Sequence, residues 1–230
     1  MKKKLVVLTG AGISAESGLK TFRDSDGLWE GFAITDVATP GAFRKNPRMV
    51  LDFYNIRRQN VLEAHPNAAH TGIAALEKDF DVHVITQNID DLHERGGSTQ
   101  VLHLHGEITK ICSVADKTVT FPYDKDLHVG DLAPDGNQLR PFIVWFEEEV
   151  PMLQKAAGIV ADADILVVVG TSLVVYPAAG LLHYADRNVP KYIVDKKIPP
   201  VTGIFNLTEI ELPATEGIKV LQDLLNSNQG

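Results

Sequence analysis

The feature that most constrains this chain is a run of small residues at positions 10–18, placed directly after an apolar segment. Residues 5–8 are all hydrophobic, which predicts a parallel strand buried on both faces. Gly10, Gly12 and Ala15 then follow the G-x-G-x-x-G/A spacing, in which the first glycine makes a tight turn and the second lets the backbone approach a pyrophosphate. Similar small residues occur in turns that bind no nucleotide. The stretch therefore predicts an α/β fold and leaves open whether this turn binds a dinucleotide.

The residues that follow differ from the usual dehydrogenase fingerprint. That fingerprint has an Asp or Glu at the end of a second strand about twenty residues later, where it binds the ribose. Here the small residues lead instead into Phe22, Arg23 and Asp24 and then into residues 27–29, which form a polar and aromatic loop. This difference favours a nucleotide-binding fold other than that of the ordinary dehydrogenases.

With this loop, the motif GAGISAESG-x-x-x-FR at positions 10–23 resembles the signature of the sirtuins, the NAD-dependent protein deacylases. The resemblance implies NAD as the cofactor. Lys20 stands where the family usually has proline, which implies a less rigid loop. An alanine at the position of Ala15 goes, in the family, with a roomy acyl pocket. The residues that the resemblance places around NAD in this segment are Gly10, Ala11, Gly12, Ala15, Phe22 and Arg23.

Composition agrees with a globular enzyme. The sequence has 230 residues, 44% of them hydrophobic and 23% charged, which is enough to bury a substantial core. A formal net charge of −8 argues against a nucleic-acid partner and favours a basic peptide as substrate. The basic start at positions 2–4 precedes only a short strand, and no apolar run of about eighteen residues follows. We therefore expect no signal peptide, no membrane partner and a cytoplasmic location.

Residues 46–64 predict a helix in which Asn46 is the N-cap and Pro47 suits the first turn. Within it, Tyr54 and Arg57 lie three residues apart and so share a face. Taken alone, these two residues favour a solvated helix face with an amphipathic tyrosine. They also match, residue for residue, the sirtuins that prefer acidic acyl groups. In those enzymes the tyrosine and arginine hold a distal carboxylate.

Polar residues follow the next predicted strand, at positions 81–86. Gln87, Asn88 and Asp90 come at its carboxyl end, where open α/β sheets place their ligands. Asp90 could instead simply cap the helix that follows. The resemblance places all three residues around the nicotinamide and ribose, and it adds Asn88 and Asp90 to the catalytic group. His70, in a further sirtuin motif that begins at position 66, is expected to order a helix end rather than to act in chemistry.

Two histidines on a short predicted strand, His103 and His105, point to the same face. Such a pair could hold a metal, but no partner ligands cluster nearby, so we expect none. In the sirtuin motif H-x-H-G the second histidine is the general base. Imidazole suits this role because its ordinary pKa lies near the operating pH. The resemblance therefore makes His105 the catalytic base, in contact with the cofactor.

Residues 110–140 depart from the family pattern. Sirtuins commonly carry two pairs of cysteines here that bind a structural zinc, whereas this chain has only Cys112. We expect a small lobe without metal, held by apolar packing of Val119, Phe121, Tyr123 and Leu127.

The sirtuin pattern returns at positions 140–148. In sirtuins this stretch binds the substrate peptide as an added strand, and the resemblance assigns this role to Val144, Trp145 and Phe146. Glu147 replaces the family's glycine, and a glycine at that place implies an unusual backbone angle. Together with residues 148 and 149 it is expected to form an acidic rim that attracts positively charged peptides.

The remaining cofactor residues come from the C-terminal third. Gly170, Thr171 and Ser172 follow a predicted strand at positions 164–169, and in sirtuins these residues contact phosphate or ribose. Asp195 ends another strand where the family often has an asparagine that contacts the adenine-side ribose, and a carboxylate can accept from the same hydroxyls. Ala214, near the start of the last predicted helix, is placed close to the adenine.

Together these elements predict a doubly wound parallel sheet of the Rossmann-like type, with a second, smaller inserted lobe that lacks a zinc site. We expect the sheet domain to comprise residues 1–29, 67–109 and 141–230, and the small lobe residues 30–66 and 110–140. The sequence does not predict an oligomeric state.

The resemblance implies an NAD-dependent protein lysine deacylase. It would remove acetyl and also succinyl or malonyl groups from protein or peptide lysines, releasing nicotinamide and O-acyl-ADP-ribose. A protein mono-ADP-ribosyltransferase would use the same pocket, but the family's specialised transferases lose the histidine base that His105 provides. A non-enzymatic sensor of NAD or ADP-ribose remains a further alternative.

Overall fold

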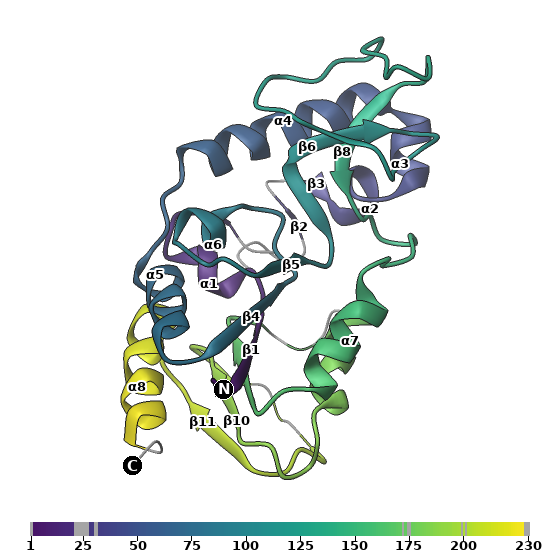
Figure 1. The fold of residues 1–230 in the computed structure, drawn as a ribbon. Coiled ribbons are helices and arrows are strands. Elements are labelled where there is room, and N and C mark those ends of the chain that lie inside the picture. The colour runs from purple at the N-terminus through teal and green to yellow at the C-terminus, as the bar shows by residue number, and fades with distance from the viewer. Residues whose placement is uncertain are drawn as a thin grey trace.

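The structure is a computed structural model that describes residues 2–20, 28–29, 32–171, 173, 176–198, 200 and 202–227. Within this part of the chain, six strands form one parallel sheet (Figure 1) in the order β11-β10-β9-β1-β4-β5. The strands are β1 (Lys4–Thr9), β4 (Asp81–Thr86), β5 (Val101–His103), β9 (Ile165–Val169), β10 (Lys191–Val194) and β11 (Leu207–Ile210). From β1 the chain builds outward through β4 and β5, then crosses to the other side of β1 for β9, β10 and β11. The predicted doubly wound sheet is confirmed, and its order reverses beside β1, where such sheets bind ligands.

The central strand β1 is buried on both faces, as its unbroken apolar sequence predicts. Leu5 and Val7 pack into one hydrophobic core, and Val6 and Leu8 pack into another on the opposite side of the sheet. All four side chains are at most 5% exposed. Alternating residues of one strand therefore join the sheet to two separate layers of helices.

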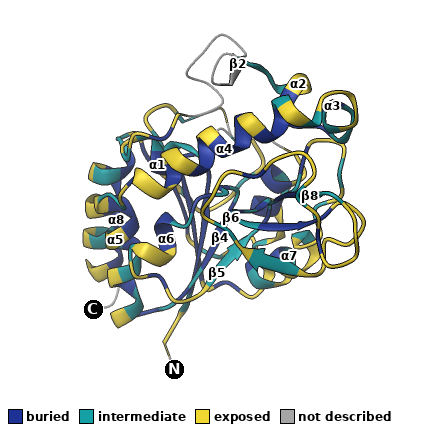
Figure 2. Ribbon diagram, turned by 90° about the horizontal axis from the view of Figure 1, so that it is seen from above, coloured by how far each residue is buried: buried dark blue, intermediate teal, exposed yellow. Residues whose placement is uncertain are grey.

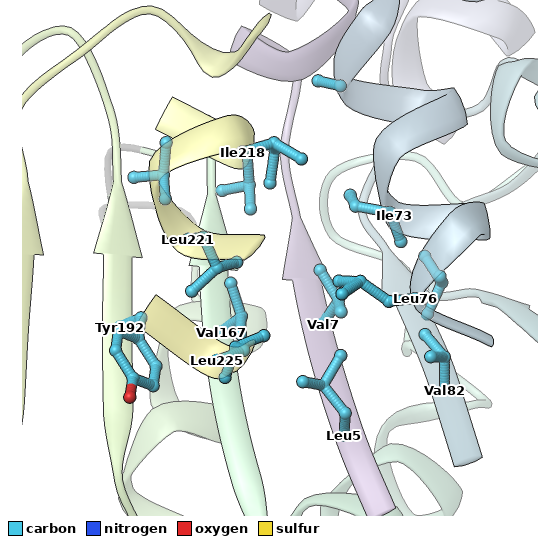
Figure 3. Close-up of a cluster of buried hydrophobic side chains, with 14 of the residues drawn as sticks. Leu5, Val7, Ile73, Leu76, Val82, Val167, Tyr192, Ile218, Leu221 and Leu225 are labelled. Carbon is cyan, nitrogen blue, oxygen red and sulfur yellow. The ribbon is translucent and has the colours of Figure 1, made fainter. Parts of the chain in front are cut away.

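The first layer consists of α5 (Ala68–Ala75), the 3₁₀ turn η1 (Leu76–Lys78) and α8 (Ala214–Ser227). Ile218, Leu221 and Leu225 recur along α8 at helical spacing, and they meet Ile73 of α5 over the sheet (Figure 3). The second layer consists of α7 (Leu153–Ala161) and the 3₁₀ helix η2 (Ala178–Tyr184). Figure 1 shows α5 and α8 on one side of the sheet and α7 on the other, so the expected helical cover on both faces is present.

A small lobe adjoins the carboxyl ends of these strands. Its helices are α2 (Ile34–Val37), α3 (Pro40–Lys45) and α4 (Pro47–Glu63), and a two-stranded ribbon, β2 (Leu28–Trp29) with β3 (Phe32–Ala33), precedes them. An antiparallel sheet completes it, in the order β7 (Thr120–Pro122), β6 (Gly106–Ser113) and β8 (Leu139–Ile143). Because β6 begins at residue 106 and β8 ends at residue 143, this sheet extends beyond residues 110–140 on both sides. The division into two domains stays a prediction.

Helix α4 begins and packs as its sequence indicates. The Asn46 side chain accepts a hydrogen bond from the Met49 N–H at 3.2 Å, and Pro47 occupies the first helical position. In Figure 2 the outward-facing side of α4 is exposed, and the side that faces the rest of the protein is buried. The inner side includes Tyr54 and Arg57, which are 1% and 8% exposed. The solvated face suggested by these two residues alone is therefore wrong.

Buried polar side chains of α4 are hydrogen-bonded to β6 and to the loop at positions 125–127. The Asn55 amide bonds both the N–H and the carbonyl of Leu127, at 2.9 and 3.0 Å. Arg58, fully buried, donates to the carbonyls of Ile108 and Lys125 at 2.9 and 3.0 Å. The lobe is thus joined by hydrogen bonds from one helix to main-chain groups far away in the sequence.

The apolar core of this segment differs in part from the prediction. Leu127 is buried, and Phe121 and Tyr123 pack against the same cluster, as expected. Val119 is 52% exposed, so its predicted place in the core is wrong. Leu51 of α4 and Ile111 of β6 are the buried partners instead, and Leu51 lies outside residues 110–140, from which the core was expected.

The described residues contain neither a metal-binding cluster nor a membrane-spanning helix. No group of three or more His, Cys, Asp or Glu side chains in the described ranges is placed to hold a metal ion. None of the helices in the same ranges is both long and apolar enough to cross a membrane.

Candidate active site

A cavity of about 650 Å³ opens at the carboxyl ends of β1, β4, β9 and β10 and extends to α2, α4 and the segment after β8. Every predicted site residue within the described ranges lines it. From the sheet domain these are Gly10, Ala11, Gly12, Ala15, Gln87, Asn88, Asp90, His105, Gly170, Thr171, Asp195 and Ala214; from the small lobe and the segment after β8 they are Tyr54, Arg57, Val144, Trp145 and Phe146. Phe22, Arg23 and Ser172 lie outside the described residues. A smaller depression of about 250 Å³ lies against α4, and none of the predicted site residues line it.

The glycines after β1 are needed for close packing against the loop after β9. The N–H groups of Gly10 and Gly12 donate to the carbonyls of Val169 and Gly170 at 3.1 and 2.8 Å. A Cβ atom on Gly12 would lie 2.7 Å from the Gly170 Cα atom. Gly170 itself has a φ of 61°, a conformation that glycine adopts without strain. These contacts hold the loop after β1 against the loop after β9 at the base of the cavity.

Three polar side chains form a buried network at the end of β4. The Ser14 hydroxyl donates to Asp90 Oδ2 and accepts from the Asn88 amide, each at 3.1 Å. Asp90 Oδ1 accepts from the N–H of Leu92, the first residue of α6 (Leu92–Arg95), at 3.2 Å. Burial raises the pKa of the Asp90 carboxyl, although these hydrogen bonds partly offset the effect. Asp90 therefore both supports the start of α6 and lines the cavity, so the two roles weighed for it are compatible.

His70 stands behind this network and keeps the helix-ordering role predicted for it. Its Nδ1 accepts from the Asn67 N–H at 3.2 Å, in a capping box at the start of α5. Its Nε2 therefore carries the proton, and it lies 3.4 Å from the Ser14 hydroxyl. Burial, with the nearby charge of Arg95, lowers the pKa of His70 to about 4, so the ring is neutral near pH 7.

His105 lies on the chain just after β5 and reaches the cavity in a defined tautomer. Its Nδ1 is 3.0 Å from the carbonyl oxygen of Gln87. Since a carbonyl can only accept, Nδ1 carries the proton and Nε2 keeps its lone pair. Burial lowers the pKa of His105, and the bond to Gln87 offsets this only in part. The ring is therefore a neutral base near pH 7.

His103, two residues earlier, has the opposite character. Its Nδ1 lies 3.0 Å from the Asn88 carbonyl and its Nε2 lies 2.8 Å from Glu94 Oε1. Burial alone would lower the pKa of His103, but the bond and charge of Glu94 outweigh it and raise that pKa. Both ring nitrogens are engaged, so His103 is a structural residue that supports the main chain of Asn88.

One arm of the cavity runs beside α4. Tyr54, Arg57 and Val61 all line it, on one face of the helix. The Tyr54 and Trp145 ring centroids are 6.3 Å apart. Burial raises the pKa of the Tyr54 phenol, which keeps it protonated and able to donate a hydrogen bond, while the nearby charge of Arg57 acts in the opposite direction. An arginine and a phenol thus line the cavity beside α4, next to the apolar Val61.

The segment after β8 is held by a buried ion pair. Arg140 donates to both carboxylate oxygens of Glu148, at 2.7 and 3.1 Å, and its guanidinium lies 3.4 Å from the centre of the Trp145 ring. Glu148 also accepts from the Trp145 N–H at 2.8 Å and pairs with Lys117. Burial alone would raise the pKa of Glu148, but Arg140 outweighs it and lowers that pKa. The two side chains fix the cavity-lining residues between them.

Glu147 has the unusual backbone angle that its position predicts. Its φ is 73°, in the left-handed region that favours glycine. The residue is exposed and lines the cavity. A glutamate therefore stands here at a backbone angle that glycine adopts most readily.

The part of the cavity next to the ends of β9 and β10 is polar. The Thr171 hydroxyl accepts from the Leu173 N–H at 3.2 Å and lies 3.3 Å from the Gln87 amide. Asp195 follows β10 directly, and its Oδ1 accepts from the Lys197 N–H at 3.1 Å. Ala214, the first residue of α8, lies in the same part. A hydroxyl, a carboxylate and an amide are thus available to a polar ligand.

Sequence reasoning missed several cavity residues. Ser14, the centre of the buried network, lay inside the glycine motif but was not assigned a role. Val61 could have been found, because it lies four residues after Arg57 on the same helix face. Leu19, Ile34 and Ala38 gave no such signal, because their place in the wall depends on contacts between segments distant in the sequence.

Comparisons with known proteins agree with this geometry. The sequence profile of the Sir2 family matches residues 10–177. A relative from Helicobacter pylori strain 26695, named NAD-dependent protein deacylase, is 55% identical over 195 residues, which cover 85% of each protein. A relative of the same name from Bacteroides thetaiotaomicron strain VPI-5482 is 49% identical over 229 residues, covering 97% of this chain and 98% of the relative.

Solved structures match over nearly the whole chain as well. A Sir2 homologue in complex with NAD has a TM-score of 0.87 at 37% identity, covering 100% of this chain and 91% of the other. A Sir2 enzyme with a deacetylated p53 peptide and 3′-O-acetyl-ADP-ribose has a TM-score of 0.80 at 32% identity, covering 97% and 94% of the two chains. The match therefore includes both the parallel sheet and the small lobe.

Proposed function

The chain belongs to the Sir2 family, and we propose that it is an NAD-dependent protein lysine deacylase. The observation that carries this proposal is the position of His105. Its basic Nε2 belongs to a neutral ring that lines the same cavity as the glycine turns after β1 and β9. The two Sir2-family relatives described above carry the same activity in their names.

The residues of the cavity fit NAD. The volume of about 650 Å³ lies at the reversal of strand order, where doubly wound folds bind dinucleotides. Small residues form the floor beside β1, while Thr171 and Asp195 offer a hydroxyl and a carboxylate to ribose or phosphate groups. When bound, NAD would supply a ribose whose glycosidic bond to nicotinamide is broken and whose hydroxyl finally receives the acyl group of the lysine.

The chain's own residues then have distinct tasks. Asn88 and Asp90, fixed through Ser14, would hold the ribose end of the cofactor in place. His105 Nε2 would take a proton from a ribose hydroxyl and so activate that hydroxyl toward the acyl carbon. The small lobe and the sheet enclose the site and limit the access of bulk water. With one water consumed, the products are the free lysine, nicotinamide and O-acyl-ADP-ribose.

One experiment separates this proposal from its alternatives. The protein is incubated with NAD and an acetyl-lysine peptide, and peptide and protein are then weighed by mass spectrometry. We expect the peptide to lose the mass of its acyl group, with nicotinamide formed in equal amount. A gain of ADP-ribose mass would indicate a mono-ADP-ribosyltransferase. Binding of NAD without any mass change would indicate a sensor.

We further propose that acidic acyl groups are preferred substrates. Arg57 and Tyr54 line the arm of the cavity beside α4, and the phenol remains protonated. A guanidinium and a phenol are both donors that suit a carboxylate. Ala15, which lines the same cavity, adds little bulk. Succinyl- and malonyl-lysine would place their terminal carboxylate at Arg57, whereas the acetyl group is too short to reach it.

The peptide is proposed to bind along the segment after β8, by strand addition to residues 144–147. This role is consistent with the position of Val144, Trp145 and Phe146 in the cavity wall. The cytoplasmic location stays a prediction from the sequence.

A further inference from the structure

The three consecutive glutamates at positions 147–149 differ sharply in their surroundings. Glu148 is turned inward and neutralised by Arg140 and Lys117. Glu149 is exposed and does not line the cavity. Glu147 is exposed and lines the cavity, and among the described residues no ion pair involves it. Only one of the three therefore presents a full negative charge to whatever occupies the opening of the cavity.

The main-chain hydrogen bonds of residues 144–147 also distinguish Glu147. The N–H groups of Val144, Trp145 and Phe146 are engaged by His105, Glu148 and Ala38, at 2.9, 2.8 and 3.0 Å. Among the described residues, the Glu147 N–H makes no hydrogen bond. A peptide that pairs with this segment thus finds its free main-chain donor at Glu147. The Glu147 side chain then lies beside that peptide.

The opening around Glu147 suits a peptide rather than a small ion. Phe146 and Tyr176 line the cavity and are 42% and 72% exposed. The aliphatic part of a long side chain can pack on the aromatic surfaces of both residues, while the Glu147 carboxylate pairs with a positive charge at its end. Lysine and arginine have this combination of an apolar stem and a cationic head.

From these observations we propose that Glu147 selects substrate peptides that carry a lysine or arginine close to the acyl-lysine. The inference rests on the proposed deacylase function and adds a residue that determines peptide specificity. An ion pair in such a partly exposed place is worth up to about fivefold in kcat/KM, and it weakens as salt is added.

The test uses acetyl-lysine peptides that differ at one position. Each of the two residues before and the two after the acetyl-lysine is in turn Arg, Ala or Glu, and kcat/KM is measured for the wild type, Glu147→Gln, Glu147→Lys and Glu149→Gln. The wild type is expected to favour Arg over Glu by about two- to fivefold at one or more positions. Glu147→Gln should bring that ratio close to one, and Glu147→Lys should reverse it. Glu149→Gln, with the same loss of charge at an exposed residue that does not line the cavity, should keep it.

The inference is overturned if the wild type shows no such preference, or if Glu147→Gln and Glu149→Gln reduce it equally. Binding of the same labelled peptides, measured by fluorescence anisotropy, provides a second readout. If no peptide is deacylated, the proposed function fails, while the anisotropy ratios for the wild type and Glu147→Lys still decide the role of Glu147.

Discussion

The Nδ1 atom of His105 lies 3.0 Å from the main-chain oxygen of Gln87, the residue that follows β4. Because β4 and β5 are neighbours in the sheet, this bond connects the ends of two adjacent strands. It fixes the tautomer of the ring and leaves Nε2 as the basic nitrogen. The backbone of the sheet thus determines which atom of the histidine can accept a proton.

The pH dependence of activity follows from this bond and from burial, which lowers the pKa of His105. A general base works only when neutral, so kcat/KM should fall as the pH falls through that pKa. We expect the midpoint of this acid limb below pH 6.5, the ordinary value for histidine. Deacylation rates between pH 5 and 8 measure it. An acid limb centred above pH 7 would contradict the neutral base.

Replacing Arg57 with methionine should remove the preference for acidic acyl groups. A hydrogen bond to a charged group is worth about 1.5 to 3 kcal/mol, or roughly 10- to 150-fold in kcat/KM. The Arg57→Met enzyme should lose most of the ratio between succinyl and acetyl peptides and stay within a few fold on acetyl peptides. Arg48→Met is the control, because Arg48 is on the same helix with its side chain 87% exposed. A succinyl preference that survives in Arg57→Met rules the proposal out.

The protein as purified should contain no stoichiometric zinc and should keep its activity in a chelator. Structural zinc takes four protein ligands, and the chain has a single cysteine, Cys112, which is buried. Elemental analysis and activity after dialysis against a chelator are the measurements. One zinc per chain, with unfolding on chelation, is the result that would contradict this.

Arg58→Met should destabilise the protein strongly. Arg58 is fully buried and donates to the carbonyls of Ile108 and Lys125 and to Asn55. Its removal leaves buried acceptors without a donor, at a cost of about 3 kcal/mol or more. Urea denaturation measures the free energy of unfolding. Arg48→Met should change it by about 0.5 kcal/mol at most, and an equally small change in Arg58→Met would be incompatible with the role described here.

The strands predicted at positions 5–8, 81–86 and 164–169 match β1, β4 and β9 within about one residue. β1 and β9 could be predicted because they are buried on both faces and therefore appear as apolar runs, whereas β4 also carries the half-buried Asp81 and His83. The polar residues after them meet at one edge because parallel strands end on the same side. Most of the proposed cofactor site follows from that rule.

Burial in the small lobe could not be predicted in the same way. From the local sequence, Tyr54 and Arg57 resemble a pair of surface residues. In the structure Trp145, about ninety residues later in the sequence, packs beside Tyr54, and the pair is buried. Val119 has the residue type of a core position but is exposed, while Leu51 and Ile111 are the buried residues that cluster with Leu127. Trp145 and Leu51 belong to elements distant in the sequence from Tyr54 and Leu127, so no local pattern predicts these contacts.

The most direct test of the account compares deacylation by the wild type and His105→Ala, with the binding of NAD measured as the rise in melting temperature. His83→Ala serves as the control, because the structure pairs His83 with Asp81 and neither residue lines the cavity. We expect His105→Ala to lose about a hundredfold to ten-thousandfold in deacylation rate while NAD still raises its melting temperature, and His83→Ala to keep its rate. Deacylation by His105→Ala at the wild-type rate would contradict the central claim that His105 is the catalytic base.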